Sequence, residues 1–342
     1  MNYSKNIQYF NNLRAVACFL VILTHSAMPA LNPAFGLFMM LFSFISSPSS
    51  ELFVTLSSSL LAPTKLGMFE FYKKRFSKLL GPFIFWSLII LLIGYFNHSF
   101  TFAETITKLI LLPIQPVTGV YWFIYVIIGL YFIIPILSPW LQKANKGELR
   151  FIISLWILTL ILPYTNLIFN KEIYSITGSY YFITSYLGGF VGYLFLGVYL
   201  RKFPIHVKSK FALFYKLFPL FIGALLPYFY GYIFNREALD MVRENLSLSS
   251  AFLVTIIFTF FQNIQLNTLL EKLFNNIAKY SFGIYLIHII VVRDIIWKVL
   301  ENHRLPHPII ETPIIAIISL ICSFLIVKIL SLMPYSKYII GV

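Results

Sequence analysis

The stretch LRAVACFLVILTHS, residues 13–26, is apolar except near its ends, where Arg14 and His25 stand with ten residues between them. Each residue turns a helix by about 100°, so both side chains leave the same face roughly three turns apart. A rise of about 1.5 Å per residue separates them by roughly 16 Å along the axis. A cation and an imidazole at that separation could hold an elongated substrate, with its anionic end at Arg14 and its reactive end at His25.

The composition of the chain indicates whether this pair lies in a membrane or in a water-soluble domain. Hydrophobic residues make up 59% of the 342 residues, charged residues make up 11%, and the mean hydropathy is +0.83. Soluble domains are about 45–50% apolar and about 25% charged. Several apolar stretches exceed the roughly 18 residues that span a bilayer as a helix, and they are continuous rather than alternating, which disfavours a barrel. We therefore expect an all-α integral membrane protein.

We predict a single membrane domain over residues 1–342, a polytopic bundle of about ten transmembrane helices. The second expected span contains SSPSSE, residues 46–51, and we expect Pro48 to break it where the freed backbone faces protein. A short amphipathic segment, ETITKLILL, is expected along the surface before the fourth span. The expected spans are residues 10–28, 35–61, 82–95, 121–140, 151–167, 180–199, 217–234, 248–261, 277–297 and 309–332.

The charged residues predict the orientation of this bundle. Most of the 26 Lys and Arg residues fall in loops that are cytoplasmic if the N-terminus is inside, so both termini are expected in the cytoplasm. The net charge of +14 then orients the chain against an anionic leaflet and is no evidence for nucleic acid. Cys18 and Cys322 lie in apolar stretches near opposite ends of the chain, which argues against a disulfide framework. We assign no metal site.

Arg14 and His25 also have ordinary structural interpretations. Arg14 lies about one turn inside the expected cytoplasmic end of its span, where a long cationic side chain can extend to the membrane surface. His25 lies near the outer end, where an imidazole can simply hydrogen-bond a backbone carbonyl. Ionisable residues inside spans are costly and usually face the bundle interior along a substrate path. Two of them on one face together favour a function.

Four segments resemble motifs of the membrane acyltransferase-3 family, in the family's order. YFNNLRAVACFLVILTHS, residues 9–26, resembles its opening helix, whose hallmark is an arginine and a histidine with ten residues between them. The others are ELFVTLSSSLL at 51–61, VYWFIYVIIGLYFIIPIL at 120–137 and KYSFGIYLIHIIVV at 279–292. Two positions depart from the family pattern. Ser57 and Ser58 replace a usual Ser-Gly pair, and Lys78 stands where a second arginine is common.

The resemblance implies an acyltransferase of the bacterial inner membrane. Such an enzyme moves an acyl group, usually acetyl from cytoplasmic acetyl-CoA, to a sugar hydroxyl of an envelope glycan or lipid-linked saccharide. His25 would be the general base, because an imidazole with a pKa near 6.5 accepts a proton near neutral pH. Arg14 would bind the phosphates or pantetheine polar groups of the donor.

The segment KKRFSK, residues 73–78, offers further candidates for binding the donor. We rank Arg75 first, and Lys78 and Lys74 are the other candidates. These side chains could gather the phosphates of CoA at the cytoplasmic end of a span. The alternative is that the cluster only anchors the chain by the positive-inside rule.

Glu51 is the second catalytic candidate, as a group that orients His25 or binds the acceptor hydroxyls. Its alternative is that SSPSSE forms an exposed loop. Three residues are candidates for binding the acceptor: Trp122 by stacking on a sugar, Ser57 by lining the site, and His288 from deep in the ninth span. An aromatic belt position for Trp122 and a helix-to-helix hydrogen bond for His288 stay open.

Other functions of a polytopic membrane protein make different sequence predictions. A transporter or flippase for lipid-linked oligosaccharides should show repeated halves or matching interrupted helices, and the sequence shows no such symmetry. A glycan polymerase would more often carry a large outer loop. A receptor or structural role leaves Arg14 and His25 unexplained. The sequence therefore favours an acyltransferase, with the flippase as the alternative.

Overall fold

The computed structural model describes residues 3–27, 36–162, 164, 188–233, 245–301 and 303–341. All regular elements in these ranges are helical, which confirms the all-α prediction for this part of the chain. The elements are α1 (Tyr3–His25), α2 (Gly36–Ser46), α3 (Ser49–Leu61), α4 (Met68–Phe96), α5 (Phe102–Leu111), η2 (Gly119–Tyr121), α6 (Trp122–Lys143), α7 (Lys146–Ile161), α10 (Val191–Lys202), α11 (Lys210–Ile233), α13 (Leu248–Asn263), α14 (Thr268–Ile289), η3 (Ile290–Ile296), α15 (Trp297–Leu300), α16 (Pro308–Leu330) and α17 (Lys337–Ile340).

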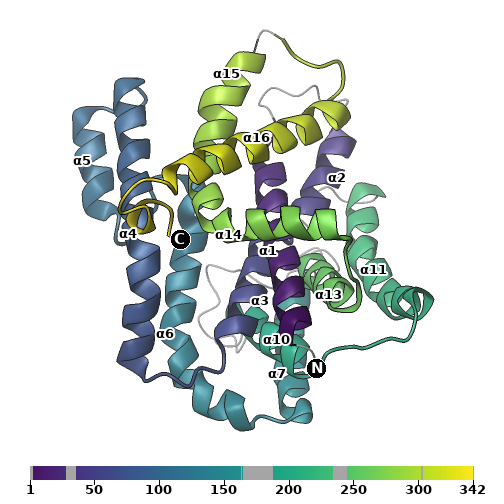
Figure 1. Cartoon of the computed structure of the whole chain (residues 1–342). Coiled ribbons are helices and arrows are strands. Elements are labelled where there is room, and N and C mark those ends of the chain that lie inside the picture. The colour runs from purple at the N-terminus through teal and green to yellow at the C-terminus, as the bar shows by residue number, and fades with distance from the viewer. Residues whose placement is uncertain are drawn as a thin grey trace.

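Helix α1 lies at the centre of the bundle, and α14 crosses it (Figure 1). It contacts α2, α3, α13, α14 and α16. Small buried side chains, including Ala17 and Cys18, let these neighbours approach its backbone. Cys18 and Cys322 are both free thiols, so they form no disulfide. The helix that carries Arg14 and His25 is therefore held by protein on several sides.

Four helices in the described ranges are long and apolar enough to cross a membrane. They are Met68–Phe96, Gly119–Lys143, Lys210–Tyr230 and Pro308–Leu330, and the shorter Leu248–Asn263 is also apolar. The count of ten spans and the cytoplasmic placement of both termini stay predictions. Parts of the expected spans fall outside the described residues, namely residues 28, 35, 163, 165–167, 180–187 and 234.

The third expected span begins earlier than its apolar stretch indicates. We expected it over residues 82–95, whereas α4 runs over Met68–Phe96 and passes through Pro82. The basic residues of KKRFSK lower the hydropathy of the first turns without preventing a helix, because Lys and Arg are good helix formers. The basic cluster therefore lies on the shaft of α4 and not in a loop before it.

The predicted break in the second span is confirmed at Pro48. Helix α2 ends at Ser46 and α3 begins at Ser49. The hydroxyls of Ser46 and Ser47 donate to the carbonyls of Phe42 and Phe44, at 2.7 and 2.9 Å, at the end of α2. Ser46, Ser47, Ser49 and Glu51 are buried, so SSPSSE is an internal turn and not an exposed loop.

A close backbone approach beside α3 depends on a glycine from another helix. A methyl group on Gly197 of α10 would lie 2.3 Å from the carbonyl oxygen of Thr55. The family's Ser-Gly pair reads Ser57-Ser58 in α3, and here the space for close packing comes from Gly197 on the facing helix. The departure in the motif therefore does not prevent tight packing of α3.

The predicted amphipathic segment before the fourth span forms α5, which has no buried residues and packs along α4 (Figure 1). Thr101 and Glu104 form a capping box at its start. The hydrogen bonds from the Thr101 amide and hydroxyl hold the pKa of the Glu104 carboxyl below its usual range. The sequence thus encodes the start of α5.

Candidate functional site

Arg14 and His25 each line a cavity of the helical bundle. The Arg14 cavity has a volume of about 350 Å³, and the His25 cavity has a volume of about 440 Å³. Tyr285 of α14 lines both. Both side chains are half-buried, and both border a cavity lined by protein along the same helix. The register predicted for this helix is therefore consistent with the structure, in which the two residues line two cavities that share Tyr285.

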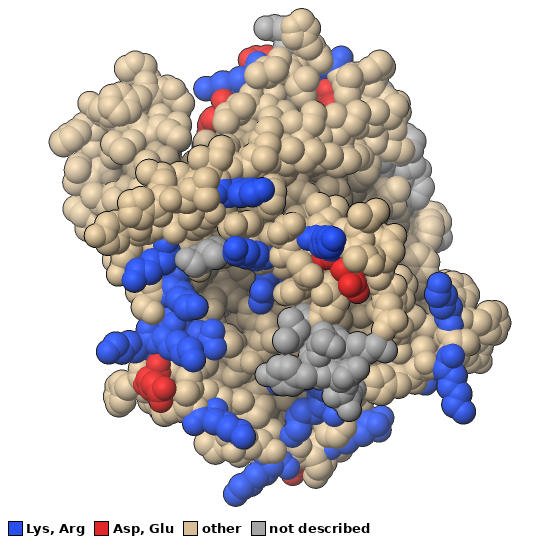
Figure 2. Space-filling view, viewed as in Figure 1, with Lys and Arg blue, Asp and Glu red and all other residues tan. Residues whose placement is uncertain are grey.

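The Arg14 cavity is basic. Arg14 shares it with Arg75 and Lys78 from α4 and with Lys279 from α14. The described lining contains no Asp or Glu, so no acidic side chain in it offsets these charges. In Figure 2, basic side chains gather beside a hollow near the point where Figure 1 marks the C-terminus, and Gly341 belongs to the lining of this cavity. The cavity is suited to an anion.

One guanidinium in this cavity is held in place but keeps donor capacity. Arg75 is half-buried, and its Cζ lies 5.7 Å from the centre of the Phe71 ring. Its Nε is buried and has no hydrogen-bond partner among the described residues. The rings of Phe53, Phe123 and Tyr131 supply an apolar wall. The site thus combines fixed positive charge with a surface for an uncharged chain.

The described lining of the His25 cavity contains hydroxyl groups, an amide and an indole, and no Lys, Arg, Asp or Glu. The break between α2 and α3 places a group of serines in this wall, and Trp122 closes it from the start of α6. Neutral hydroxyl and amide groups next to an indole ring are suited to a polyhydroxylated molecule. The lining serines are Ser43, Ser46, Ser47, Ser49 and Ser50.

His288 lies next to His25 but does not line the His25 cavity. Its side chain is fully buried, and the centres of the two imidazole rings are 5.4 Å apart. Nδ1 of His288 lies 2.5 Å from the carbonyl oxygen of Tyr285. Because a carbonyl only accepts, this nitrogen carries the hydrogen, and a neutral ring then leaves Nε2 as an acceptor. Nε2 has no partner among the described residues.

Glu51 is fully buried in the first turn of α3. Neither carboxylate oxygen has a hydrogen-bond partner among the described residues, and the side chain lines neither cavity. Ser49 and Ser50, directly before it, do line the His25 cavity. The structure therefore brings the start of α3 to the site without bringing the Glu51 carboxylate into it.

Two of the three remaining candidates line a cavity. Ser57 lines the Arg14 cavity, and Trp122 lines the His25 cavity. Lys74 is exposed and lines neither.

Sequence reasoning missed Lys279 and Tyr285, although both lie in the quoted motif KYSFGIYLIHIIVV. Ala278, Ser281 and Tyr285 recur at helical spacing and line the Arg14 cavity together, a pattern that could have identified this face of α14.

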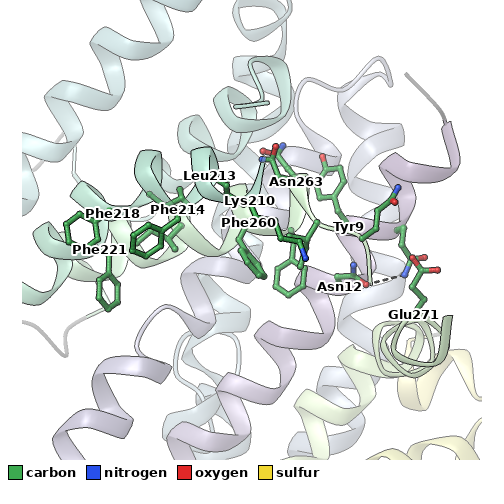
Figure 3. A pocket seen from close by; sticks show the side chains of 17 residues that line it. Tyr9, Asn12, Lys210, Leu213, Phe214, Phe218, Phe221, Phe260, Asn263 and Glu271 are labelled. Atoms are coloured by element: carbon green, nitrogen blue, oxygen red, sulfur yellow. Dashed lines mark hydrogen bonds between the residues drawn. The ribbon is translucent and has the colours of Figure 1, made fainter. Parts of the chain in front are cut away.

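A larger cavity of about 900 Å³ is lined by neither Arg14 nor His25. In Figure 3, Phe214, Phe218 and Phe221 of α11 form one side of it, while Tyr9, Asn12 and other polar residues form the opposite end. Its described lining holds no histidine and none of the candidate site residues. The basic and hydroxyl-lined cavities are therefore the better candidates for chemistry, despite their smaller volumes.

Comparisons with known proteins identify the family of the chain. No significant match is found among curated proteins or among solved structures. A family model described as an acyltransferase domain matches residues 7–328. This range is nearly the whole chain and includes both cavities except for Gly341. The chain is a membrane protein by its apolar helices, and it belongs to the acyltransferase-3 family.

Proposed function

We propose that this protein is a multi-pass O-acetyltransferase of the bacterial inner membrane. It would move acetyl from cytoplasmic acetyl-CoA to a hydroxyl of an envelope glycan or lipid-linked saccharide. The observation that carries the proposal is the pair of cavities along α1, one basic and one lined by hydroxyls and His25. Within the family, the length and the sequence of the first helix resemble those of the enterobacterial common antigen O-acetyltransferase, and this resemblance favours an acetyl donor and a glycan acceptor.

The donor is assigned to the Arg14 cavity. CoA carries several phosphate charges, and guanidinium groups bind phosphate oxygens through paired hydrogen bonds. Arg14 and Arg75 would supply these bonds, and Lys78 and Lys279 would add positive charge. Pantetheine is less polar and would lie along Phe53 and the neighbouring rings. The thioester would then point toward Tyr285, where this cavity meets the next.

The acceptor is assigned to the His25 cavity. A sugar would stack on Trp122 and exchange hydrogen bonds with the serines of the helix break. His25 would take the proton of the acceptor hydroxyl as its oxygen attacks the thioester carbonyl carbon. The new C–O bond forms, the C–S bond breaks, and the proton passes to the leaving sulfur, so that free CoA thiol is released.

His288 and Glu51 would act as positioning residues. With its hydrogen on Nδ1, His288 can accept a hydrogen bond at Nε2 from the His25 ring. The other nitrogen of His25 is then left unprotonated and able to act as the base. Glu51 begins α3, so we propose that it sets the position of the serine wall rather than touching the acceptor.

The proposal is tested by following both products. The intact protein is reconstituted in vesicles with acetyl-CoA and extracted envelope glycan, and free CoA thiol is measured with the base-labile acetyl signal of the glycan by NMR. We expect both to rise together and only when glycan is present. The same NMR signal should disappear from the glycans of cells that lack the gene. Movement of lipid-linked saccharide across the vesicle without thiol release would support the flippase alternative and overturn the proposal.

A further inference from the structure

We propose that Tyr285 is the partition between the donor and acceptor cavities, and that this partition restricts the transferred group to a short acyl chain. The inference rests on the proposed function and deepens it, because it names the residue that sets the acyl length. Tyr285 lines both cavities, and only 6% of its surface is exposed. An acyl group that passes from CoA to the acceptor must therefore pass its ring.

The Tyr285 ring is held by contacts from both cavities. Its hydroxyl donates to the carbonyl oxygen of Val120 at 2.7 Å, and Val120 lines the His25 cavity. The centre of the Phe123 ring, which lines the Arg14 cavity, lies 5.7 Å away in an edge-to-face arrangement. The centre of the His288 ring also lies 5.7 Å from the centre of the Tyr285 ring. A side chain with these contacts cannot swing aside without losing a buried hydrogen bond.

A second hydrogen bond reinforces the first. The Tyr121 hydroxyl donates to the carbonyl oxygen of Leu286 at 2.6 Å. Two adjacent residues of η2 are therefore joined to two adjacent residues of α14 by two buried hydrogen bonds. The Tyr285 carbonyl also accepts from Nδ1 of His288. Both ends of Tyr285, the backbone and the phenol, are therefore fixed. Packed interiors resist added volume, because neighbouring side chains must leave their preferred rotamers.

Because Tyr285 cannot move aside, a longer acyl chain has less room to pass it than a shorter one, and the partition therefore selects by acyl length. The chemical step is the same for every acyl group: a C–O bond forms, a C–S bond breaks, and the hydroxyl proton ends on the CoA thiol. One methylene in a tight pocket changes selectivity by about 10- to 200-fold. We therefore expect the wild-type protein to prefer acetyl-CoA over butyryl-CoA by at least about 100-fold in kcat/KM.

The experiment measures kcat/KM for acetyl-, propionyl-, butyryl- and hexanoyl-CoA with the intact protein in vesicles and extracted envelope glycan. Tyr285→Ala removes the partition and should shift the acetyl-to-butyryl ratio toward butyryl by at least about 10-fold. Tyr285→Phe keeps the ring and loses only the bond to Val120, so its ratio should stay nearer to wild type. Tyr280→Ala is the matched control, because this tyrosine lies on the same helix, packs on Phe324 and lines neither cavity.

The outcomes separate this inference from the proposed function. If the wild-type protein transfers acetyl but uses hexanoyl-CoA equally well, the partition is overturned while the acyltransferase assignment stands. An unchanged ratio in active Tyr285→Ala, or an equal shift in Tyr280→Ala, also overturns it. If Tyr285→Ala is inactive, Tyr285→Leu is measured instead, because it opens the partition less. An acetyl-to-butyryl ratio unchanged from wild type in active Tyr285→Leu would then overturn the inference, as would a wild-type protein that uses all four acyl lengths equally. Absence of acetyl transfer by wild type would instead refute the proposed function.

Discussion

The two cavities along α1 are similar in volume and opposite in chemistry. The Arg14 cavity collects positive charge from three helices, whereas the described lining of the His25 cavity holds hydroxyls, an amide and an indole. Each difference arises locally: the first from the basic turns of α4 and α14, and the second from the serine-rich break before α3. One helix therefore lines two chemically different cavities, and the proposed transfer between two substrates would use both.

The largest effect should come from removing His25, the proposed general base, from the hydroxyl-lined cavity. We expect His25→Ala to lower kcat by about 10²- to 10⁴-fold, the usual contribution of a general base, with little change in donor binding. The measurement is thiol release at saturating acetyl-CoA, together with direct binding of CoA. His303→Ala is the matched control, because this histidine is exposed and lines neither cavity. Equal losses in the two variants would remove His25 from catalysis.

A smaller and different effect should follow from neutralising the basic cavity. Arg75→Ala should raise the KM for acetyl-CoA by about 10- to 150-fold, because a hydrogen bond to a charged group contributes about 1.5–3 kcal/mol. The acceptor KM should not change. Lys74→Ala removes the neighbouring charge of the same cluster, but this side chain is exposed and outside both cavities. A similar rise for Lys74→Ala would mean that the cluster acts as general surface charge.

Substitutions of His288 should lower kcat by less than the loss of His25 does. The size of this loss should depend on which ring nitrogen of His288 the new side chain imitates. His288→Asn can keep the donor to the Tyr285 carbonyl but loses the acceptor at Nε2, whereas His288→Gln can place an amide oxygen near Nε2. We expect Asn to lower kcat by about 10-fold and Gln to retain more activity. Donor KM and thermal stability are measured for both. A loss that follows stability rather than the imitated nitrogen would make His288 purely structural.

The sequence predicted the parts of this arrangement that depend on local rules. Helical periodicity placed Arg14 and His25 on one side of α1, and Pro48 marked the break that forms the serine wall. Hydropathy placed the start of α4 too late, because it excludes basic turns that are nevertheless helical. The proposed partition could not be read from the chain, because Tyr285 and Val120 meet across 165 positions. The Glu51 carboxylate was expected at the site, whereas in the structure Glu51 is fully buried and lines neither cavity.

The smallest effect gives the sharpest test of the comparison, because it uses two serines of one helix. Ser50 lines the His25 cavity, while Ser57 lines the Arg14 cavity. Each alanine substitution removes one neutral hydroxyl, which contributes about 0.5–1.5 kcal/mol when it hydrogen-bonds a ligand, or about 2- to 10-fold in KM. Ser50→Ala should therefore raise the acceptor KM alone, and Ser57→Ala should raise the donor KM alone. Since the two changes are chemically identical, a difference between them can only come from the cavity that each residue faces. If both variants changed the same KM, the two cavities would be serving a single substrate, and the assignment of donor and acceptor to opposite ends of α1 would be wrong.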